Sequence, residues 1–216
     1  MSQFNPTSRT RIQRAPTRGV YDRDVVYSIL DEALICHIGF VDNSQPYVIP
    51  TIHARIDDTL YIHGATSSRM LTVLKQGVPA CLTVTLLDGL VLARSAFHHS
   101  MNYRSVVILG TMAEVIDQEK RSAVLTALVE HVVPGRSADA RPPNAQELKA
   151  TSLLSMPLAE VSAKVRTGPP VDDEEDYGLP VWAGVVPVPV TPAAPEPDPR
   201  LTAGIPVPDY VSGYRR

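Results

Sequence analysis

The chain has 216 residues, of which 44% are hydrophobic, so it can form one domain with a substantial core. A formal net charge of −3 and an aromatic content of only 6% argue against a surface for nucleic acid. No apolar run is long enough to span a bilayer, and the N-terminus lacks the apolar segment of a signal peptide. We therefore expect a soluble, cytoplasmic protein that binds neither nucleic acid nor membrane.

The cysteines and histidines do not form a recognisable metal site. Cys36 and Cys81 each lie in an apolar run with no second cysteine nearby. No His, Asp, Glu or Cys set has the spacing of metal ligands. We predict two reduced thiols and no metal-binding residue.

The first part of the chain is predicted to form a basic arm, a helix and three strands. Residues 1–18 contain four arginines and no acidic residue, which predicts a flexible arm that is mobile or lies over a partner. Residues 22–32 place apolar side chains on one face of a helix. Strands are predicted at residues 33–41, 47–54 and 59–63.

Residues 60–70 read LYIHGATSSRM and combine an apolar strand, a turn of small residues and the start of a helix. Free backbone N–H groups, the hydroxyls of Ser67 and Ser68 and the guanidinium of Arg69 would meet there, which is typical of a phosphate site. The alternative is an ordinary helix start, with a serine as N-cap and Arg69 in solvent. The segment alone leaves both interpretations open.

The next segment is rich in predicted strands. A turn signal at Asp88-Gly89 separates strands at residues 79–86 and 90–95, and residues 97–102 are polar and irregular. Residues 103–116 form a long predicted strand that contains the apolar run VVIL. Four consecutive apolar residues indicate that both faces of this strand are covered, the outer one by a helix or a second subunit.

The last part of the chain contains one clear helix and a proline-rich end. Asp117 is predicted to cap a helix over residues 118–133, and residues 152–166 form a further strand. Residues 181–190 are predicted to form an edge strand, because two prolines interrupt the pattern. Residues 187–216 are predicted to form a semi-extended tail without a core of its own.

About eight short strands joined mostly by short turns predict a mainly β fold, a small antiparallel barrel with flanking helices. The chain has neither a Gly-x-Gly-x-x-Gly motif after a strand nor a Walker-type phosphate loop. The predicted organisation is a basic arm at residues 1–18, a barrel domain at 19–186 and a proline-rich tail at 187–216.

Several short segments, in this order, resemble the pyridoxamine 5′-phosphate oxidase-like superfamily of FMN-binding split β-barrels. The resemblance covers residues 21–186 and is strongest to the flavin-nucleotide-binding branch, which includes the nitroimidazole-resistance reductases. The segments are PYVIPT (46–51), YIHG (61–64), SRM (68–70), DGLVLARS (88–95), NYRSVVILG (102–110), PGR (134–136), SAKVR (162–166) and VWAG (181–184).

The resemblance implies a homodimer with two FMN sites, each shared between the subunits. Ser67, Ser68 and Arg69 would bind the FMN phosphate, and Arg104 and Ser105 would complete the pocket from the other subunit. The backbone of a strand edge would line the isoalloxazine ring, and Pro50 in that strand has no N–H to give to a ladder. The residues of this edge are Val48, Ile49, Pro50 and Thr51.

Three further residues are candidate contacts of the cofactor or of an anionic substrate. Lys164 and Arg166 alternate along a strand, and this basic face would bind an anionic substrate or the flavin phosphate, or else face solvent. Trp182 is the only tryptophan, and it would serve as a core or interface anchor or contact the flavin.

His63 is the candidate catalytic residue. It ends the strand before the phosphate turn, where it would contact the cofactor and donate a proton, or instead hydrogen bond to the turn backbone. His98 and His99 are adjacent in an extended segment, so at most one of them would face a flavin. The remaining candidates, interpreted as structural, are His37, His53 and His131.

The function that the resemblance implies is an FMN-dependent oxidoreductase acting on a small organic substrate. Pyridoxamine-phosphate oxidation itself is not expected, because the chain lacks that enzyme's C-terminal Arg-Leu-His motif and the lysine that follows its first flavin strand. The alternatives are a protein that carries flavin without turnover, a haem protein with His63, His98 or His99 as axial ligand, and a deazaflavin protein.

Overall fold

The computed structural model describes residues 2–215, which contain ten strands in one sheet whose pairings are all antiparallel. The strand order is β1-β9-β6-β5-β2-β3-β4-β8-β7, and β10 pairs with β5. The prediction of a mainly antiparallel β fold is confirmed. The strands are β1 (Gly19–Val20), β2 (Ile35–Asp42), β3 (Gln45–Ile56), β4 (Thr59–Ala65), β5 (Ala80–Leu92), β6 (Ser100–Gly110), β7 (Ala113–Glu114), β8 (Thr151–Pro157), β9 (Glu160–Arg166) and β10 (Gly184–Pro187).

Two of the helices begin where the sequence predicts. The Asp22 carboxylate accepts hydrogen bonds from two backbone N–H groups of α1, and Asp117 accepts one from Lys120 in α3. Among residues 2–215, no helix is both long and apolar enough to cross a bilayer. The helical segments are η1 (Pro16–Arg18), α1 (Arg23–Glu32), α2 (Arg69–Leu74), η2 (Ala96–His98), α3 (Gln118–Val132), α4 (Arg136–Asp139), α5 (Ala145–Ala150), η3 (Glu174–Gly178) and α6 (Asp209–Ser212).

The barrel is split along β3. Residues 45–52 of this strand pair with β2, whereas residues 53–56 pair with β4. Beyond that point β3 and β4 diverge, so the second edge of residues 45–52 has no strand partner in the described chain. This free edge carries backbone donors and acceptors that a ligand or a second chain can use.

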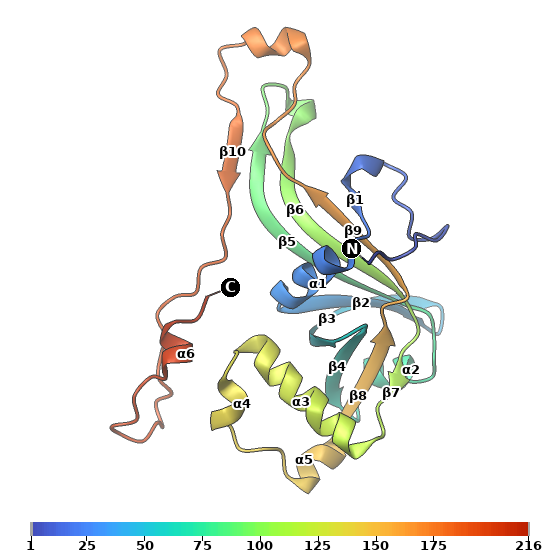
Figure 1. Cartoon of the computed structure of the whole chain (residues 1–216), viewed down its shortest axis with the longest axis vertical. Helices are drawn as coiled ribbons and strands as arrows, with labels where there is room; N and C mark the ends of the chain where they lie inside the picture. The colour runs from blue at the N-terminus through green and yellow to red at the C-terminus, as the bar shows by residue number, and fades with distance from the viewer. Residues whose placement is uncertain (1, 216) are drawn as a thin grey trace.

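Two apolar clusters hold the fold together. The larger one fills the barrel and includes the apolar faces of α1 and α2, with Leu30 and Leu74 fully buried. The smaller one lies where α3 packs across β3, β4 and β8, and it contains Tyr61, Val124 and Leu128 (Figure 1). Burial of these side chains is the main source of stability.

The predicted turn at Asp88-Gly89 is wrong, because β5 runs through it as one strand with a bulge between Leu87 and Gly89. β10 pairs with β5 at this point, and a Cβ atom on Gly89 would lie only 2.9 Å from Cγ1 of Val185 in β10. Glycine is therefore required by this close approach rather than by a turn.

The other strand boundaries also need correction. Residues 97–102 were predicted to be irregular, but β6 already begins at Ser100, and the predicted strand 103–116 ends at Gly110 before the short β7. The single strand predicted over residues 152–166 is two strands, β8 and β9. They belong to different halves of the barrel, since β8 pairs with β4 and β9 with β6.

Both ends of the chain lie against the barrel domain. In the N-terminal arm, Phe4 is buried and its N–H donates to Tyr21, and Arg9 forms an ion pair with Glu160 on β9. At the other end, β10 runs along β5, and the proline-rich tail then continues to α6, which lies beside α4 (Figure 1).

The outer face of the sheet is incompletely covered. Val106 and Ile108 are fully buried in the barrel, as predicted, whereas Val107 and Leu109 on the opposite side are only half-buried. Paired neighbours on a sheet point to the same side, so this face extends from Val107 across β5 and β2 to β3. Four exposed aliphatic side chains on β2 and β3 belong to it: Ile35, Val41, Val48 and Ile52.

Candidate functional site

The free edge of β3 connects two features of the predicted cofactor site. At one end, the Arg69 guanidinium lies 4.3 Å from the centre of the Tyr47 ring. At the other end, Ile52 borders a cavity next to His63. The strand between Tyr47 and Ile52 spans about 17 Å, and Pro50 within it has no N–H to pair with a neighbouring strand.

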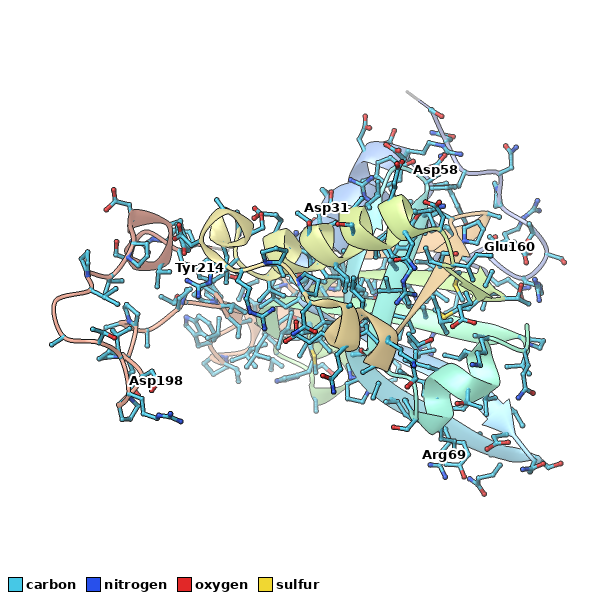
Figure 2. The ribbon with its side chains drawn as sticks, turned by 90° about the horizontal axis from the view of Figure 1, so that it is seen from below. Asp31, Asp58, Arg69, Glu160, Asp198 and Tyr214 are labelled. Atoms are coloured by element: carbon cyan, nitrogen blue, oxygen red, sulfur yellow. The ribbon has the colours of Figure 1, made fainter. Side chains whose placement is uncertain are left out.

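The predicted phosphate residues lie at the start of α2. Ser68 is the N-cap, but its hydroxyl makes no capping hydrogen bond, and Ser67 is exposed. Arg69 is exposed and makes no ion pair within residues 2–215. Figure 2 shows Arg69 at the edge of the molecule, well away from the C-terminal tail with Tyr214. These groups are free to bind an anion, as the phosphate interpretation requires.

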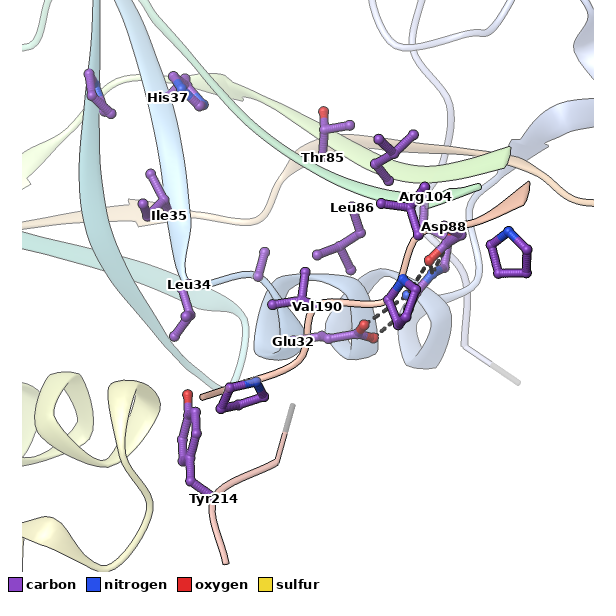
Figure 3. Close-up of a pocket in the computed structure, with 17 residues that line it drawn as sticks. Glu32, Leu34, Ile35, His37, Thr85, Leu86, Asp88, Arg104, Val190 and Tyr214 are labelled. Atoms are coloured by element: carbon purple, nitrogen blue, oxygen red, sulfur yellow. Dashed lines mark hydrogen bonds and ion pairs between the residues drawn. The ribbon is translucent and has the colours of Figure 1, made fainter. Parts of the chain in front are cut away.

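Arg104 is held by two carboxylates of its own chain. Its guanidinium donates to Asp88 from Nε at 3.0 Å and from Nη2 at 2.8 Å, and Nη1 and Nη2 both donate to Glu32 (Figure 3). These hydrogen bonds raise the pKa of Arg104. Arg104, Glu32 and Asp88 line a cavity of about 710 Å³. Its walls are mostly apolar and include prolines of the tail and Tyr214. A flavin phosphate bound by Arg104 would have to compete with both carboxylates.

The remaining predicted cofactor residues are Ser105, Lys164 and Trp182. The Ser105 hydroxyl donates to the Lys164 carbonyl at 3.3 Å, and Lys164 is half-buried on β9. Trp182 is 66% exposed, with its ring against Gly184 at the start of β10. Their predicted contacts with flavin in a dimer stay predictions.

His63 lies beside an apolar cavity of about 300 Å³ between α3 and the split in the sheet. Its Nδ1 atom is buried and has no hydrogen-bond partner in the described chain. Burial lowers the pKa of His63 below its usual value of about 6.5, so the imidazole is neutral at pH 7. The other residues around the cavity are Ile52, Leu125, Leu128, Val129, Val132, Val133 and Arg136.

Four of the five remaining histidines have protein partners, whereas His37 is exposed and lines the larger cavity, and its side chain makes no hydrogen bond or ion pair within residues 2–215. His53 and His131 lie with their rings 4.8 Å apart, and their Nε2 atoms donate at 2.9 Å to the carbonyls of Leu30 and Ala33. On the β5–β6 hairpin, Nε2 of His98 lies 3.2 Å from an Asp173 carboxylate oxygen, and Nδ1 of His99 donates to the Ser95 carbonyl. His63 is therefore the histidine at the smaller cavity, and its Nδ1 has no hydrogen-bond partner in the described chain.

The sequence interpretation missed the contribution of α3 to this site. Leu125, Val129 and Val132 belong to the apolar stripe of the helix, yet only Val124 and Leu128 on that stripe are buried. The apolar stripe of α3 is wider than the core requires, and this excess of apolar positions in the sequence indicates a further apolar surface on the helix. The role of Arg136 could not be found in this way, because it follows the end of the helix.

The strand order and the split along β3 define a split barrel. A sequence model described as "Pyridoxamine 5'-phosphate oxidase" matches residues 22–165. The chain belongs to this family of pyridoxamine 5′-phosphate oxidase-like, flavin-binding proteins. No curated protein matches it significantly.

Two solved structures match almost the whole chain. The flavocytochrome Anf3 from Azotobacter vinelandii is 41% identical with a TM-score of 0.92, and the match covers 98% of this chain and 99% of that protein. The FAD- and haem-binding protein from Mycobacterium smegmatis is 37% identical with a TM-score of 0.87, covering 91% and 96% of the two chains. These relatives support a flavin cofactor for the family branch to which the chain is similar.

A more distant match supports the fold alone. It is a 5-nitroimidazole antibiotic resistance protein from Bacteroides thetaiotaomicron, 23% identical with a TM-score of 0.58, covering 68% of this chain and 86% of that one.

Proposed function

We propose that this protein binds a flavin nucleotide and haem together and acts as a redox protein. The observation that carries the proposal is His63, a half-buried, neutral imidazole at the wall of an apolar cavity whose buried Nδ1 has no partner in the described chain. Two relatives that match nearly the whole chain, one a flavocytochrome and the other an FAD- and haem-binding protein, support it.

The His63 cavity fits haem better than it fits acid–base catalysis. A proton donor at neutral pH needs a pKa near 7, whereas burial lowers the pKa of His63. A neutral imidazole in apolar surroundings is a common axial ligand of haem iron. Apart from Arg136, the cavity is lined by His63 and six aliphatic side chains, which suit the porphyrin face. Arg136 is placed to meet a carboxylate.

A flavin is proposed to bind along the free edge of β3. Ser67, Ser68 and Arg69 would hold its phosphate, and the backbone of residues 48–51 would meet the polar edge of the isoalloxazine ring. The ring would then point toward Ile52 and the His63 cavity. FMN was the prediction from sequence, whereas the mycobacterial relative binds FAD, and both nucleotides share the part that this site would contact.

When bound, the flavin exchanges one or two electrons and haem iron exchanges one, so the pair would serve electron transfer to a small acceptor. The chain's own residues would hold the two groups at neighbouring positions and keep water away from the haem face. An oxidoreductase acting on a small molecule is the activity class that this arrangement supports.

A homodimer would cover the exposed outer face. Val48 is 69% exposed and Ile35 52% exposed beside the free edge of β3, and contiguous aliphatic surface of this kind marks interaction sites. Val48→Glu should convert a dimer to monomer in light scattering after size exclusion. Ile116→Glu, at a site that is 80% exposed before α3, is the matched control and should leave the dimer intact.

The absorption spectrum and mass analysis of what co-purifies with the protein test the proposal. A Soret band together with a flavin spectrum, and the masses of haem and of FMN or FAD, are expected. A protein that carries flavin and does not take up added hemin would reduce the proposal to a flavin-binding protein. A colourless protein that ignores both cofactors would refute it.

A further inference from the structure

The C-terminal tail returns to the His63 cavity through two tyrosines. The Tyr214 hydroxyl donates to the carbonyl of Val132, in the last turn of α3, at 2.9 Å. The Tyr210 hydroxyl donates to an Asp139 carboxylate oxygen at 2.7 Å and accepts from Nη1 of Arg136 at 3.1 Å. Val132 and Arg136 both border the cavity.

The turn after α3 is shaped to receive the Tyr210 ring. Gly135 has φ +89°, a left-handed conformation that favours glycine. A Cβ atom at this position would lie only 3.4 Å from the Tyr210 ring, so the ring packs directly on the glycine backbone. Tyr210 is therefore fixed by packing as well as by its hydroxyl.

Between its two attachments the tail lines the larger cavity through Pro189, Val190 and Pro192 but makes no hydrogen bond to the domain within residues 2–215. Val188 donates to the Asp88 carbonyl, but residues 189–207 hydrogen bond only among themselves within the described chain. Val190 is 73% exposed and Ile205 54% exposed. Of residues 189–215, only the α6 region makes directional contacts with the body of the protein, and it makes them beside the cavity.

Arg136 has a charge that no carboxylate of the described chain neutralises directly. The Tyr210 hydroxyl lies between its guanidinium and Asp139, and no ion pair joins the two residues. Arg136 is also the only charged side chain among the described residues that line the cavity. An uncompensated guanidinium at the rim of an apolar cavity with a free imidazole suits a planar apolar ligand that ends in carboxylates.

We infer that Tyr210 is a positioning residue, whose hydroxyl holds the Arg136 guanidinium at the cavity rim so that it binds a carboxylate of the molecule bound at His63. This inference rests on the proposed function, in which that molecule is haem and the carboxylates are its propionates. The C-terminal tail is then a part of the cofactor site, attached across a proline-rich spacer.

Titration of the apo-protein with hemin and with hemin dimethyl ester, which lacks the free carboxylates, tests the inference. Arg136→Gln should weaken hemin binding about tenfold, and Tyr210→Phe about three- to fivefold, because a charge-assisted bond is lost or loosened. The double variant should match Arg136→Gln, and none of the variants should change the affinity for the ester. Tyr214→Phe, which removes a tail contact that does not reach Arg136, should leave the preference for hemin over the ester unchanged.

Three results would overturn the inference while leaving haem binding in place. Hemin affinity could be unchanged in Tyr210→Phe, or it could fall equally for hemin and ester, as general loosening of the tail would cause. The effects of the two substitutions could also add in the double variant. If the wild-type protein binds neither porphyrin, the proposed function fails and the inference fails with it.

Discussion

The two cavities of this protein differ in how their polar groups are satisfied. In the larger cavity, the Arg104 guanidinium makes hydrogen bonds to both Glu32 and Asp88. In the smaller one, His63 has a buried nitrogen without a partner, and Arg136 has no carboxylate paired with it. Burying a polar atom such as Nδ1 of His63 without a partner costs free energy, which a ligand that bonds to it would offset, whereas Arg136 is exposed.

This difference separates the tasks of the two regions. The paired charges of the larger cavity join α1, β5 and β6, and they act on stability. The unpaired groups of the smaller cavity are proposed to act in binding. Size alone would have selected the larger cavity as the functional one.

Replacement of His63 is expected to have the largest effect. His63→Ala should lower hemin affinity on the order of 100-fold or more, because a direct iron ligand matters more than residues that only orient one. Flavin content should not change. The measurement is a hemin titration followed by the Soret band. His37→Ala, at a histidine that lines the other cavity, is the control, and an equal loss in that variant would contradict the assignment.

Removal of the Arg69 guanidinium should affect only the flavin. Arg69→Ala should weaken flavin binding about tenfold or more, through the loss of a charge-assisted hydrogen bond to phosphate. Fluorescence quenching of added FMN and FAD measures this affinity. Lys75→Ala, at the other end of α2, should bind flavin as the wild type does. Unchanged flavin affinity in Arg69→Ala would show that Arg69 does not bind the flavin phosphate.

In the larger cavity, a substitution should affect stability instead of binding. Arg104→Met leaves two carboxylates facing each other and should lower the free energy of unfolding by about 1–2 kcal/mol, a value reduced by partial solvent exposure. Urea unfolding measures it. Arg141→Met breaks the more exposed ion pair with Glu147 and should lower the free energy of unfolding by less than Arg104→Met does. A loss of hemin affinity in Arg104→Met would contradict the account, in which the larger cavity contributes to stability and only the smaller one binds hemin.

The smallest expected effect is on the pH dependence of stability. Because burial lowers the pKa of His63 in the folded protein, the unfolded chain takes up its proton first as the pH falls through about 6.5. Stability associated with the neutral imidazole is therefore present above that pH and is lost below it. Apo-protein with His63→Gln should lose less unfolding free energy than wild type between about pH 7.5 and about pH 5.5. Equal losses would show that the imidazole is not buried.

The sequence predicted the fold well where local signals and burial agree. Two helices begin at Asp22 and Asp117, and Val106 and Ile108 are buried, whereas the cover predicted for the other face of this strand is incomplete at Val107 and Leu109. Prediction failed at Asp88-Gly89, where the glycine makes room for β10, a strand that lies far along the chain. A local turn signal cannot be told from such a distant packing requirement.

The candidate site shows the same limit. His63 and Arg69 could be selected because both adjoin a strand-to-helix turn. Arg136, Tyr210 and Tyr214 could not, since their proximity depends on how α3 ends and where the tail returns. The partners of Arg104, Glu32 and Asp88, also come from distant parts of the chain.

Rescue of a His63→Gly variant by free imidazole tests the central claim most directly. Hemin should stay with this variant through gel filtration only when imidazole is in the buffer, because the added imidazole replaces the missing ligand in the same space. Haem retained at the wild-type level without imidazole would contradict the account, and so would failure of imidazole to restore it in a variant that still binds flavin.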